Sequence, residues 1–131
     1  MIEPTHSCPF CSPIHERVLI EGVFACAIWD GFPLNPGHVL VVPRRHVASW
    51  FEATASERDE MLRLADEARR LVTERHAPDA FNLGINDGLA AGQTVPHLHL
   101  HLIPRFVGDV PDPRGGVRWI IPGRAAYWNK P

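Results

Sequence analysis

The sequence predicts an α+β domain built on an antiparallel sheet, and three observations support this fold class. Short aliphatic and β-branched runs are separated by Gly, Pro, Asn and Asp, which is typical of neighbouring strands joined by turns. One longer stretch, from Ser56 to about Glu74, has apolar residues at helical spacing. The chain has 131 residues, which suits one domain. A single long helix among mostly adjacent strands favours α+β over an alternating α/β arrangement.

In the first half of the chain we expect three strands and one short helical turn. These lie at residues 17–21, 23–29, 38–43 and 48–51. Gly22 suits a tight turn between the first two strands. Residues 30–37 hold Gly, Pro, Asn or Asp at almost every position and predict a loop. His38 stands where this loop meets a buried strand, a place where functional residues are often found.

The long helix is expected to begin at Ser56, with Asp59 completing a capping box. Its apolar positions form a stripe that should pack into the core: Met61, Leu62, Leu64, Ala65, Ala68, Leu71 and Val72. A strand is predicted over residues 81–86, and an edge strand over 117–121. The tail, residues 123–131, is expected to fold back over the domain or across a partner chain.

Residues 95–103 alternate His with apolar residues, which is the two-residue period of a strand with two different faces. His97, His99 and His101 share one face, and the intervening leucines face the core. Burying three rings without partners would cost roughly 1–3 kcal/mol for each ring. A catalytic or metal site is therefore expected here. The preceding loop, residues 87–94, could bring backbone amides to a phosphate, or it could be an ordinary turn.

The composition excludes several classes of protein. It is 45% hydrophobic and 21% charged, as in soluble globular domains, and no segment is long and apolar enough to span a membrane. The net charge of −2 gives no overall field that would attract nucleic acid. Residues 1–6 lack the basic start and apolar run of a secretory signal, so a cytoplasmic location is expected.

Three cysteines cannot all pair with one another. In a reducing compartment the two-residue gap between Cys8 and Cys11 indicates half of a zinc site or a redox pair. Two thiolates supply only half of a tetrahedral site, and the alternative is that both are free thiols near the terminus. Cys26 lies in an apolar run and is expected to be a small buried hydrophobic residue.

Two blocks of the sequence resemble the signature of the histidine triad (HIT) family. Residues 92–103 read Gly-Gln-Thr-Val-Pro-His-Leu-His-Leu-His-Leu-Ile, and residues 35–46 read Asn-Pro-Gly-His-Val-Leu-Val-Val-Pro-Arg-Arg-His. The resemblance implies a single domain over residues 1–131, with a core of about 8–105 and a C-terminal extension, 106–131. It also implies an antiparallel sheet of about five strands with one long helix, and sheets continued across a homodimer.

The same resemblance implies a reaction on nucleoside phosphates, in which a histidine attacks the α-phosphorus and water hydrolyses the nucleotidyl-histidine. His99 would be the nucleophile, with His101 and His38 beside the phosphate. The implied substrate-binding residues are Asp30 at the ribose, Asn86 near the phosphates, and Gln93 and Thr94 at phosphate oxygens. Two structural alternatives stay open: His38 could cap a strand, and Asp30 could bond its own loop.

The resemblance further implies a structural zinc ion. Some family members complete such a site with a His after the second block and with the first His of the triad, which here gives Cys8, Cys11, His46 and His97. His6 and His15 compete for the fourth position. Magnesium could enter with a polyphosphate substrate.

Within the family, residues 93–94 and 104–109 look more like the fragile-histidine-triad branch, which cleaves dinucleoside polyphosphates. Arg105 would suit a polyphosphate anion. The alternatives are a nucleoside phosphoramidase and a nucleotide-binding module with little turnover. Repair of adenylated DNA ends is less expected, because the charge is near neutral and no basic tail is present.

Overall fold

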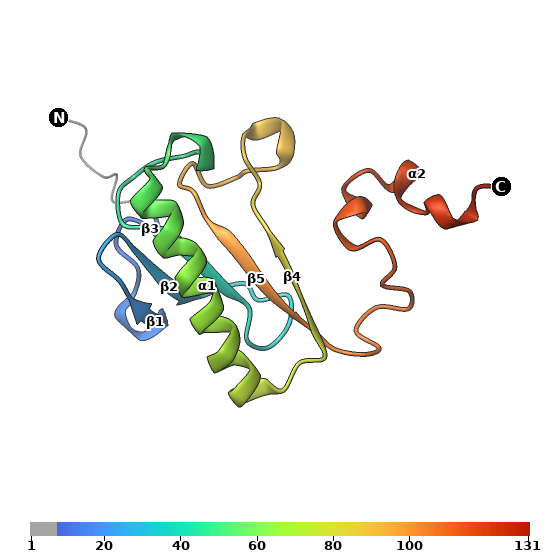
Figure 1. Cartoon of the computed structure of the whole chain (residues 1–131), viewed down its shortest axis with the longest axis horizontal. Coiled ribbons are helices and arrows are strands. Elements are labelled where there is room, and N and C mark those ends of the chain that lie inside the picture. The colour runs from blue at the N-terminus through green and yellow to red at the C-terminus, as the bar shows by residue number, and fades with distance from the viewer. Residues whose placement is uncertain (1–7) are drawn as a thin grey trace.

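The computed structural model describes residues 8–131 of the chain, and its arrangement is shown in Figure 1. Five strands form one antiparallel sheet in the order β1-β2-β3-β5-β4. Their bounds are β1 Val18–Glu21, β2 Ala25–Trp29, β3 Val39–Pro43, β4 Ala80–Gly84 and β5 Leu100–Arg105. The long helix α1, Ala55–His76, crosses one face of the sheet. The predicted α+β fold class is confirmed.

Helix α1 begins earlier than predicted, because a different pair of residues forms its capping box. The Thr54 hydroxyl accepts from the Glu57 amide at 3.1 Å, and the Glu57 carboxylate accepts from the Thr54 amide at 2.8 Å. The predicted Ser56 and Asp59 pair is therefore wrong. Arg45 adds a second anchor, since its guanidinium donates to the buried Glu57 carboxylate at 2.9 Å. That hydrogen bond lowers the pKa of Glu57 below its ordinary value.

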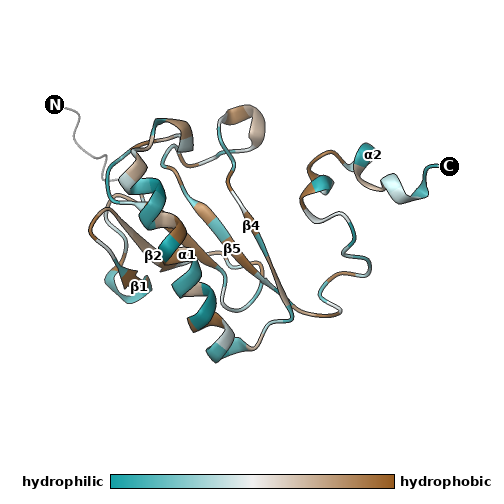
Figure 2. Ribbon diagram, in the orientation of Figure 1, coloured by the Kyte–Doolittle hydropathy of each residue, from teal (hydrophilic) through white to brown (hydrophobic). Residues whose placement is uncertain are grey.

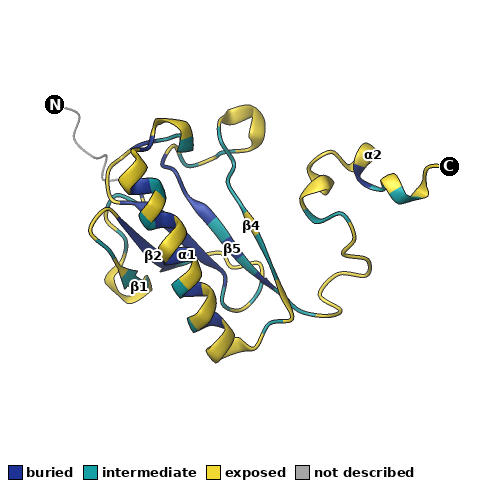
Figure 3. Ribbon diagram, viewed as in Figure 1, coloured by how far each residue is buried: buried dark blue, intermediate teal, exposed yellow. Residues whose placement is uncertain are grey.

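The core lies between α1 and the sheet, and Figure 3 shows the buried inner side of the helix. The helix contributes Met61, Leu64, Ala65, Ala68 and Val72, which pack against Ala25, Ala27, Val39, Val41, Leu98, Leu100 and Leu102 of the sheet. Figure 2 shows the same division between the two sides of α1 as a difference in hydropathy. Leu62 was predicted to be in the core, but its side chain is 51% exposed because it lies on the outer side of α1.

The other face of the sheet carries the histidines and a smaller apolar cluster. Cys26, Ile28, Leu40 and Val42 are buried there beneath Phe10 and Val18. Because successive side chains of a strand point to opposite faces, β2 and β3 are buried on both sides. This second cluster holds the N-terminal segment against the strands that carry the histidines.

The His strand is shorter at its start and longer at its end than its pattern predicts. Regular pairing begins at Leu100, and Pro104 and Arg105 still pair with β4. Pro104 lies beyond the last pairing with β3, at Leu102, so its missing N–H removes no bond on that side.

The chain after β5 leaves the sheet and forms a separate C-terminal arm, residues 113–131, which extends beyond β4 (Figure 1). The arm consists of short helical elements: η4 Gly116–Ile120, α2 Pro122–Ala125 and η5 Tyr127–Asn129. The predicted edge strand at 117–121 is wrong, because positive φ angles at Gly115 and Gly116 turn the backbone into η4. None of the helices within residues 8–131 has the length and apolar character needed to cross a membrane.

Candidate active site and metal cluster

The candidate active site lies on the sheet face opposite α1, at a cavity of about 590 Å³. His101 enters it from β5 and His99 from the residues just before that strand, and Asp30 and Asn86 come from two loops. Its lining also includes Phe10, Ile28, Leu40, Gly92, Thr94 and Val95. His38, which is only 3% exposed, lies just before β3 with its ring next to that of His101. The sheet therefore brings the two sequence blocks together.

The hydrogen bond of His99 fixes which of its nitrogens is free to react. Its Nδ1 lies 2.8 Å from the backbone carbonyl oxygen of His97. A carbonyl only accepts, so Nδ1 carries the proton and donates, and Nε2 of the neutral ring carries the lone pair. His99 is therefore held in the tautomer that a nitrogen nucleophile needs.

His38 and His101 form a relay of defined direction. The Leu34 amide donates to His38 Nδ1 at 3.1 Å, which leaves the proton of the neutral ring on Nε2. His38 Nε2 then donates to His101 Nδ1 at 3.0 Å. The His101 proton is consequently on Nε2, the ring nitrogen that does not face His38. A donor at this position suits an anionic phosphate oxygen.

The electrostatics of the site keep these rings neutral near pH 7. Burial lowers the pKa of His101 to about 4, with His99 and His38 adding to the effect. Burial also lowers the pKa of His38, against the opposing effect of Asp30. A neutral His38 ring can accept at Nδ1 and donate at Nε2 without first losing a proton.

Asp30 makes the loop hydrogen bond that one interpretation of its sequence position predicted, and it also lines the cavity. Its Oδ1 accepts from the Phe32 amide at 2.8 Å, as a loop-bonding residue does. Its Oδ2 lies 3.3 Å from His38 Nε2, and the residue also lines the cavity. Donor atoms of Asp30, His38 and His101 lie within 4.8 Å of one another. The Leu34 amide keeps the proton on His38 Nε2, so that this nitrogen is a hydrogen-bond donor and has no lone pair for a metal ion.

Gln93 and Arg105, two residues for which phosphate contacts were predicted, use their side chains elsewhere. Gln93 accepts from the Gly88 amide at 2.8 Å and donates to the Ala48 carbonyl at 2.9 Å, which holds the loop before the His strand. Arg105 donates twice to Asp109, at 2.8 Å each, and once to Asn82, at 2.7 Å. Gln93 also donates to the carbonyl of Val95, which lines the cavity, so its side chain holds the loop beside the histidines.

The structure brings Cys8, Cys11, His46 and His97 into one cluster, with four donor atoms within 4.8 Å. Cys11 Sγ lies 3.0 Å from His46 Nδ1, and Cys8 Sγ lies 3.4 Å from His97 Nδ1. His97 Nε2 donates to the Pro43 carbonyl at 2.8 Å, which leaves the Nδ1 lone pair facing the cluster.

This donor set fits a tetrahedral ion. Two thiols and two imidazoles are a common zinc ligand set. Burial and the neighbouring Cys8 raise the pKa of the Cys11 thiol to about 11, a cost that a bound cation would remove. Of the two competing ligands, His15 lies outside the cluster, and His6 lies outside the described residues.

Sequence reasoning missed Phe10 and Leu34. The Phe10 ring lies 5.0 Å from the His99 ring and 5.9 Å from the His97 ring, between centroids, and so contacts both the cavity and the metal cluster. Its place between the two cysteines was the only signal available. Leu34 acts through its backbone amide, which no side-chain pattern reveals.

The lowered pKa of His101 predicts a loss of stability in mild acid. The unfolded chain, with a histidine pKa of about 6.5, binds a proton before the folded chain does, at about 4. The stabilising contribution is complete above about pH 6.5 and is lost as the pH falls towards 4. Urea unfolding across this range should show a falling free energy of unfolding.

In the His101→Asn variant, the number of protons taken up on unfolding in this pH range should fall by about one. The free energy of unfolding should therefore depend less on pH. His76→Asn, at an exposed histidine on α1, is the control and should keep the dependence of the parent chain. Equal pH dependence in both variants would contradict the assignment.

Comparison with known proteins gives one family over most of the chain. The HIT domain model matches residues 12–108. The chain is 36% identical over 97 residues to a bis(5'-nucleosyl)-tetraphosphatase [asymmetrical] of Schizosaccharomyces pombe, covering 74% of this chain and 53% of the relative. It is 34% identical over 108 residues to an AP-4-A phosphorylase of Mycobacterium tuberculosis, covering 82% and 55%. The chain thus spans about half the length of these curated relatives.

Among solved structures, the fold resembles a zinc-bound histidine triad family protein from Mycobacterium smegmatis. The TM-score is 0.69 at 33% sequence identity, and the match covers 81% of this chain and 84% of that one. The match covers most of both chains, so the likeness applies to the domain as a whole.

Proposed function

The chain belongs to the HIT family, and we propose that it cleaves dinucleoside polyphosphates by attack of His99 on the α-phosphorus. The observation that carries this proposal is the His99 tautomer: a free Nε2 lone pair at a cavity of about 590 Å³ that His101 also lines. We also propose that residues 1–131 form one domain, with its core at about residues 8–105.

In the proposed first step His99 Nε2 forms a bond to phosphorus as the bond from phosphorus to the leaving polyphosphate oxygen breaks. A water molecule then attacks the nucleotidyl-histidine, which releases the nucleoside monophosphate and restores the lone pair. The Nε2 proton of His101 would stabilise the charge that develops on a non-bridging oxygen. His38 would hold His101 in that tautomer through the 3.0 Å hydrogen bond.

We assign the remaining site residues to substrate binding by their place around the cavity. Thr94 and Asn86 would contact phosphate oxygens, and Asp30 would accept from a ribose hydroxyl. Phe10, Ile28 and Leu40 give the cavity an apolar wall suited to a nucleobase. Gln93 would serve the same substrate indirectly, by holding the loop that carries Thr94.

The names of the relatives favour dinucleoside polyphosphates over nucleoside phosphoramidates as substrates. One is called a tetraphosphatase and another a phosphorylase, at 36% and 34% identity. They differ in the second acceptor, which is water in a hydrolase and inorganic phosphate in a phosphorylase. Hydrolysis is the proposed reaction, and phosphoramidase activity and nucleotide binding with little turnover are the alternatives.

Chromatographic assays with diadenosine triphosphate, diadenosine tetraphosphate and an adenosine phosphoramidate test this proposal. The parent chain should cleave the dinucleotides faster than the phosphoramidate and release AMP. His99→Ala should lower turnover by about 10³-fold or more, because nucleophiles of this kind act as a unit with their partners. His76→Ala is the matched control and should retain the parent rate.

Added inorganic phosphate separates the two chemistries. Conversion of diadenosine triphosphate to ADP alone would identify a phosphorylase. Faster cleavage of the phosphoramidate would overturn the proposed substrate class. Tight nucleotide binding without turnover of any substrate would overturn the proposed enzyme activity.

We further propose that Cys8, Cys11, His46 and His97 hold one structural zinc ion. The supporting observations are the 4.8 Å cluster and the Nδ1 lone pair of His97 that faces it. Zinc would tie the N-terminal segment to the residues before β5 and so fix Phe10 over His99.

Purified protein should contain about one zinc ion per chain by elemental analysis, and Cys8→Ser should lose most of it. Cys26→Ala is the matched control, because Cys26 is buried in β2 and belongs to the apolar cluster instead. His15→Ala should also keep its zinc. Zinc content that is unchanged by Cys8→Ser would refute this ligand set.

We propose that two chains form a homodimer through β4. This strand is the edge of the sheet next to the arm, and Leu83 on it is 51% exposed. Unpaired edge strands with exposed apolar residues favour pairing with another chain.

Sedimentation equilibrium should give twice the mass of one chain. Leu83→Asp should shift the measured mass towards that of a single chain. A monomeric parent chain would overturn the proposal. We also propose a cytoplasmic location, because the cysteines among the described residues, Cys8, Cys11 and Cys26, form no disulfide.

A further inference from the structure

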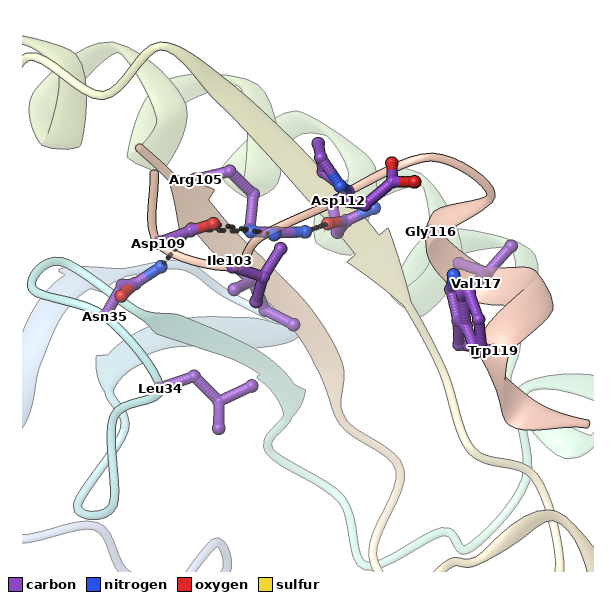
Figure 4. A pocket seen from close by; sticks show the side chains of 12 residues that line it. Leu34, Asn35, Ile103, Arg105, Asp109, Asp112, Gly116, Val117 and Trp119 are labelled. Carbon is purple, nitrogen blue, oxygen red and sulfur yellow. Dashed lines mark hydrogen bonds and ion pairs between the residues drawn. The ribbon is translucent and has the colours of Figure 1, made fainter. Parts of the chain in front are cut away.

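A second polar network lies beside the active site at the far end of β5, where it lines another cavity (Figure 4). Its centre is the Asp109 carboxylate. Asp109 accepts from Arg105 through both oxygens, at 2.8 Å each, and from the Phe106 amide at 3.1 Å. The fourth donor is the Asn35 side-chain amide at 2.9 Å.

Asn35 connects this carboxylate to the loop that precedes β3. Its Nδ2 donates to the Asp109 carboxylate and to the Pro104 carbonyl, both at 2.9 Å. Its own backbone carbonyl accepts from the His38 amide at 3.2 Å. Asn35 therefore connects the loop before β3 to the end of β5. Asn35 and Pro104 are 69 residues apart in the sequence.

The neighbouring residue in this loop is Leu34, whose amide donates to His38 Nδ1 at 3.1 Å. That bond places the His38 proton on Nε2 and sets the direction of the relay to His101. The position of the Leu34 amide depends on where residues 34 and 35 are held. Among the described residues, the hydrogen bonds that join residues 34 and 35 to a part of the chain outside the loop and β3 are those of Asn35 with Asp109 and Pro104.

The polar groups around this second cavity are satisfied by one another. Arg105 bonds Asp109 and Asn82, and Asp109 in turn accepts from Asn35. The Asp109 side chain is only 13% exposed and that of Arg105 is 22% exposed. Groups that are already paired and mostly covered act as structural supports rather than as ligands for a substrate.

We propose that Asp109 is a positioning residue for His38: through Asn35 it fixes the loop whose Leu34 amide selects the Nε2-protonated tautomer. Without the carboxylate, Asn35 keeps only the Pro104 carbonyl as a partner and the Leu34 amide loses its fixed place. Part of the His38 population can then take the Nδ1-protonated form, which presents a lone pair instead of a donor to His101, while the Asp30 carboxylate, 3.3 Å from Nε2, favours the other form. The kinetic consequence rests on the proposed function, whereas the tautomer itself does not.

The test compares Asp109→Ala, which removes every side-chain acceptor at this position, with Asp112→Ala in the full chain. Both substitutions remove one carboxylate from the lining of the same cavity. Among the described residues, the Asp112 side chain bonds only Arg114, at 3.0 Å and longer, so its removal should leave the loop unchanged. Asp109→Glu restores the charge on a longer side chain and should recover part of the effect.

Nitrogen-15 NMR of the histidine rings reads the tautomer directly, with His38→Gln used to assign the His38 signals. The parent chain and Asp112→Ala should show the Nε2-protonated form, and Asp109→Ala should show a mixture of both forms. The Leu34 amide should exchange with solvent about 10-fold faster or more in Asp109→Ala. Turnover of diadenosine polyphosphate should fall by ~10-fold to 100-fold with KM within about twofold, as for other outer partners of a site.

The two kinds of failure are distinguishable. An unchanged His38 tautomer and unchanged Leu34 exchange in Asp109→Ala would overturn the positioning role, whatever the rate. A parent chain that does not cleave dinucleotides overturns the proposed function, and the NMR comparison still decides the role of Asp109. If Asp109→Ala does not fold, Asn35→Leu removes the same contact from the other side and should give the same tautomer mixture; an unmixed signal in that variant would overturn the proposal.

Discussion

The site depends on one kind of interaction: a hydrogen bond on the ring nitrogen that faces away from the chemistry. The His97 carbonyl binds His99, the Pro43 carbonyl binds His97, and the Leu34 amide binds His38. Two partners are acceptors and one is a donor, so the protons are placed differently on the three rings. Each choice leaves the facing nitrogen in the protonation state that the proposed nucleophile, metal ligand or hydrogen-bond donor needs.

These fixing groups belong to the backbone, and the fold places them more rigidly than it could place side chains. His97 contributes to both candidate sites at once, since its ring faces the metal cluster and its carbonyl binds the His99 ring. His97 therefore connects the metal cluster to the active site. Phe10 provides a second connection, because it lies between the two cysteines and its ring packs on both histidines.

Burial supports the same arrangement by keeping the rings neutral. The pKa values of His38, His97 and His101 are all lowered, with burial as the largest cause in each case. A charged ring at any of these positions would lose its acceptor nitrogen and change the direction of the relay. The apolar residues beneath the histidines, among them Leu40 and Ile28, thus contribute to the chemistry as well as to the stability of the sheet.

The sequence by itself determined the fold class and the histidine face. Both follow from local rules, since strand alternation and helical spacing are properties of neighbouring residues. The cysteine spacing indicated half of a metal site, and only the resemblance to the HIT family implied His46 and His97 as the other two ligands. The sequence did not determine the capping box, the helical arm after Gly116, or the partners of Gln93 and Arg105. The tertiary structure alone decided the tautomers and the connection from Asp109 to His38, because hydrogen bonds between residues far apart in the chain leave no periodic pattern.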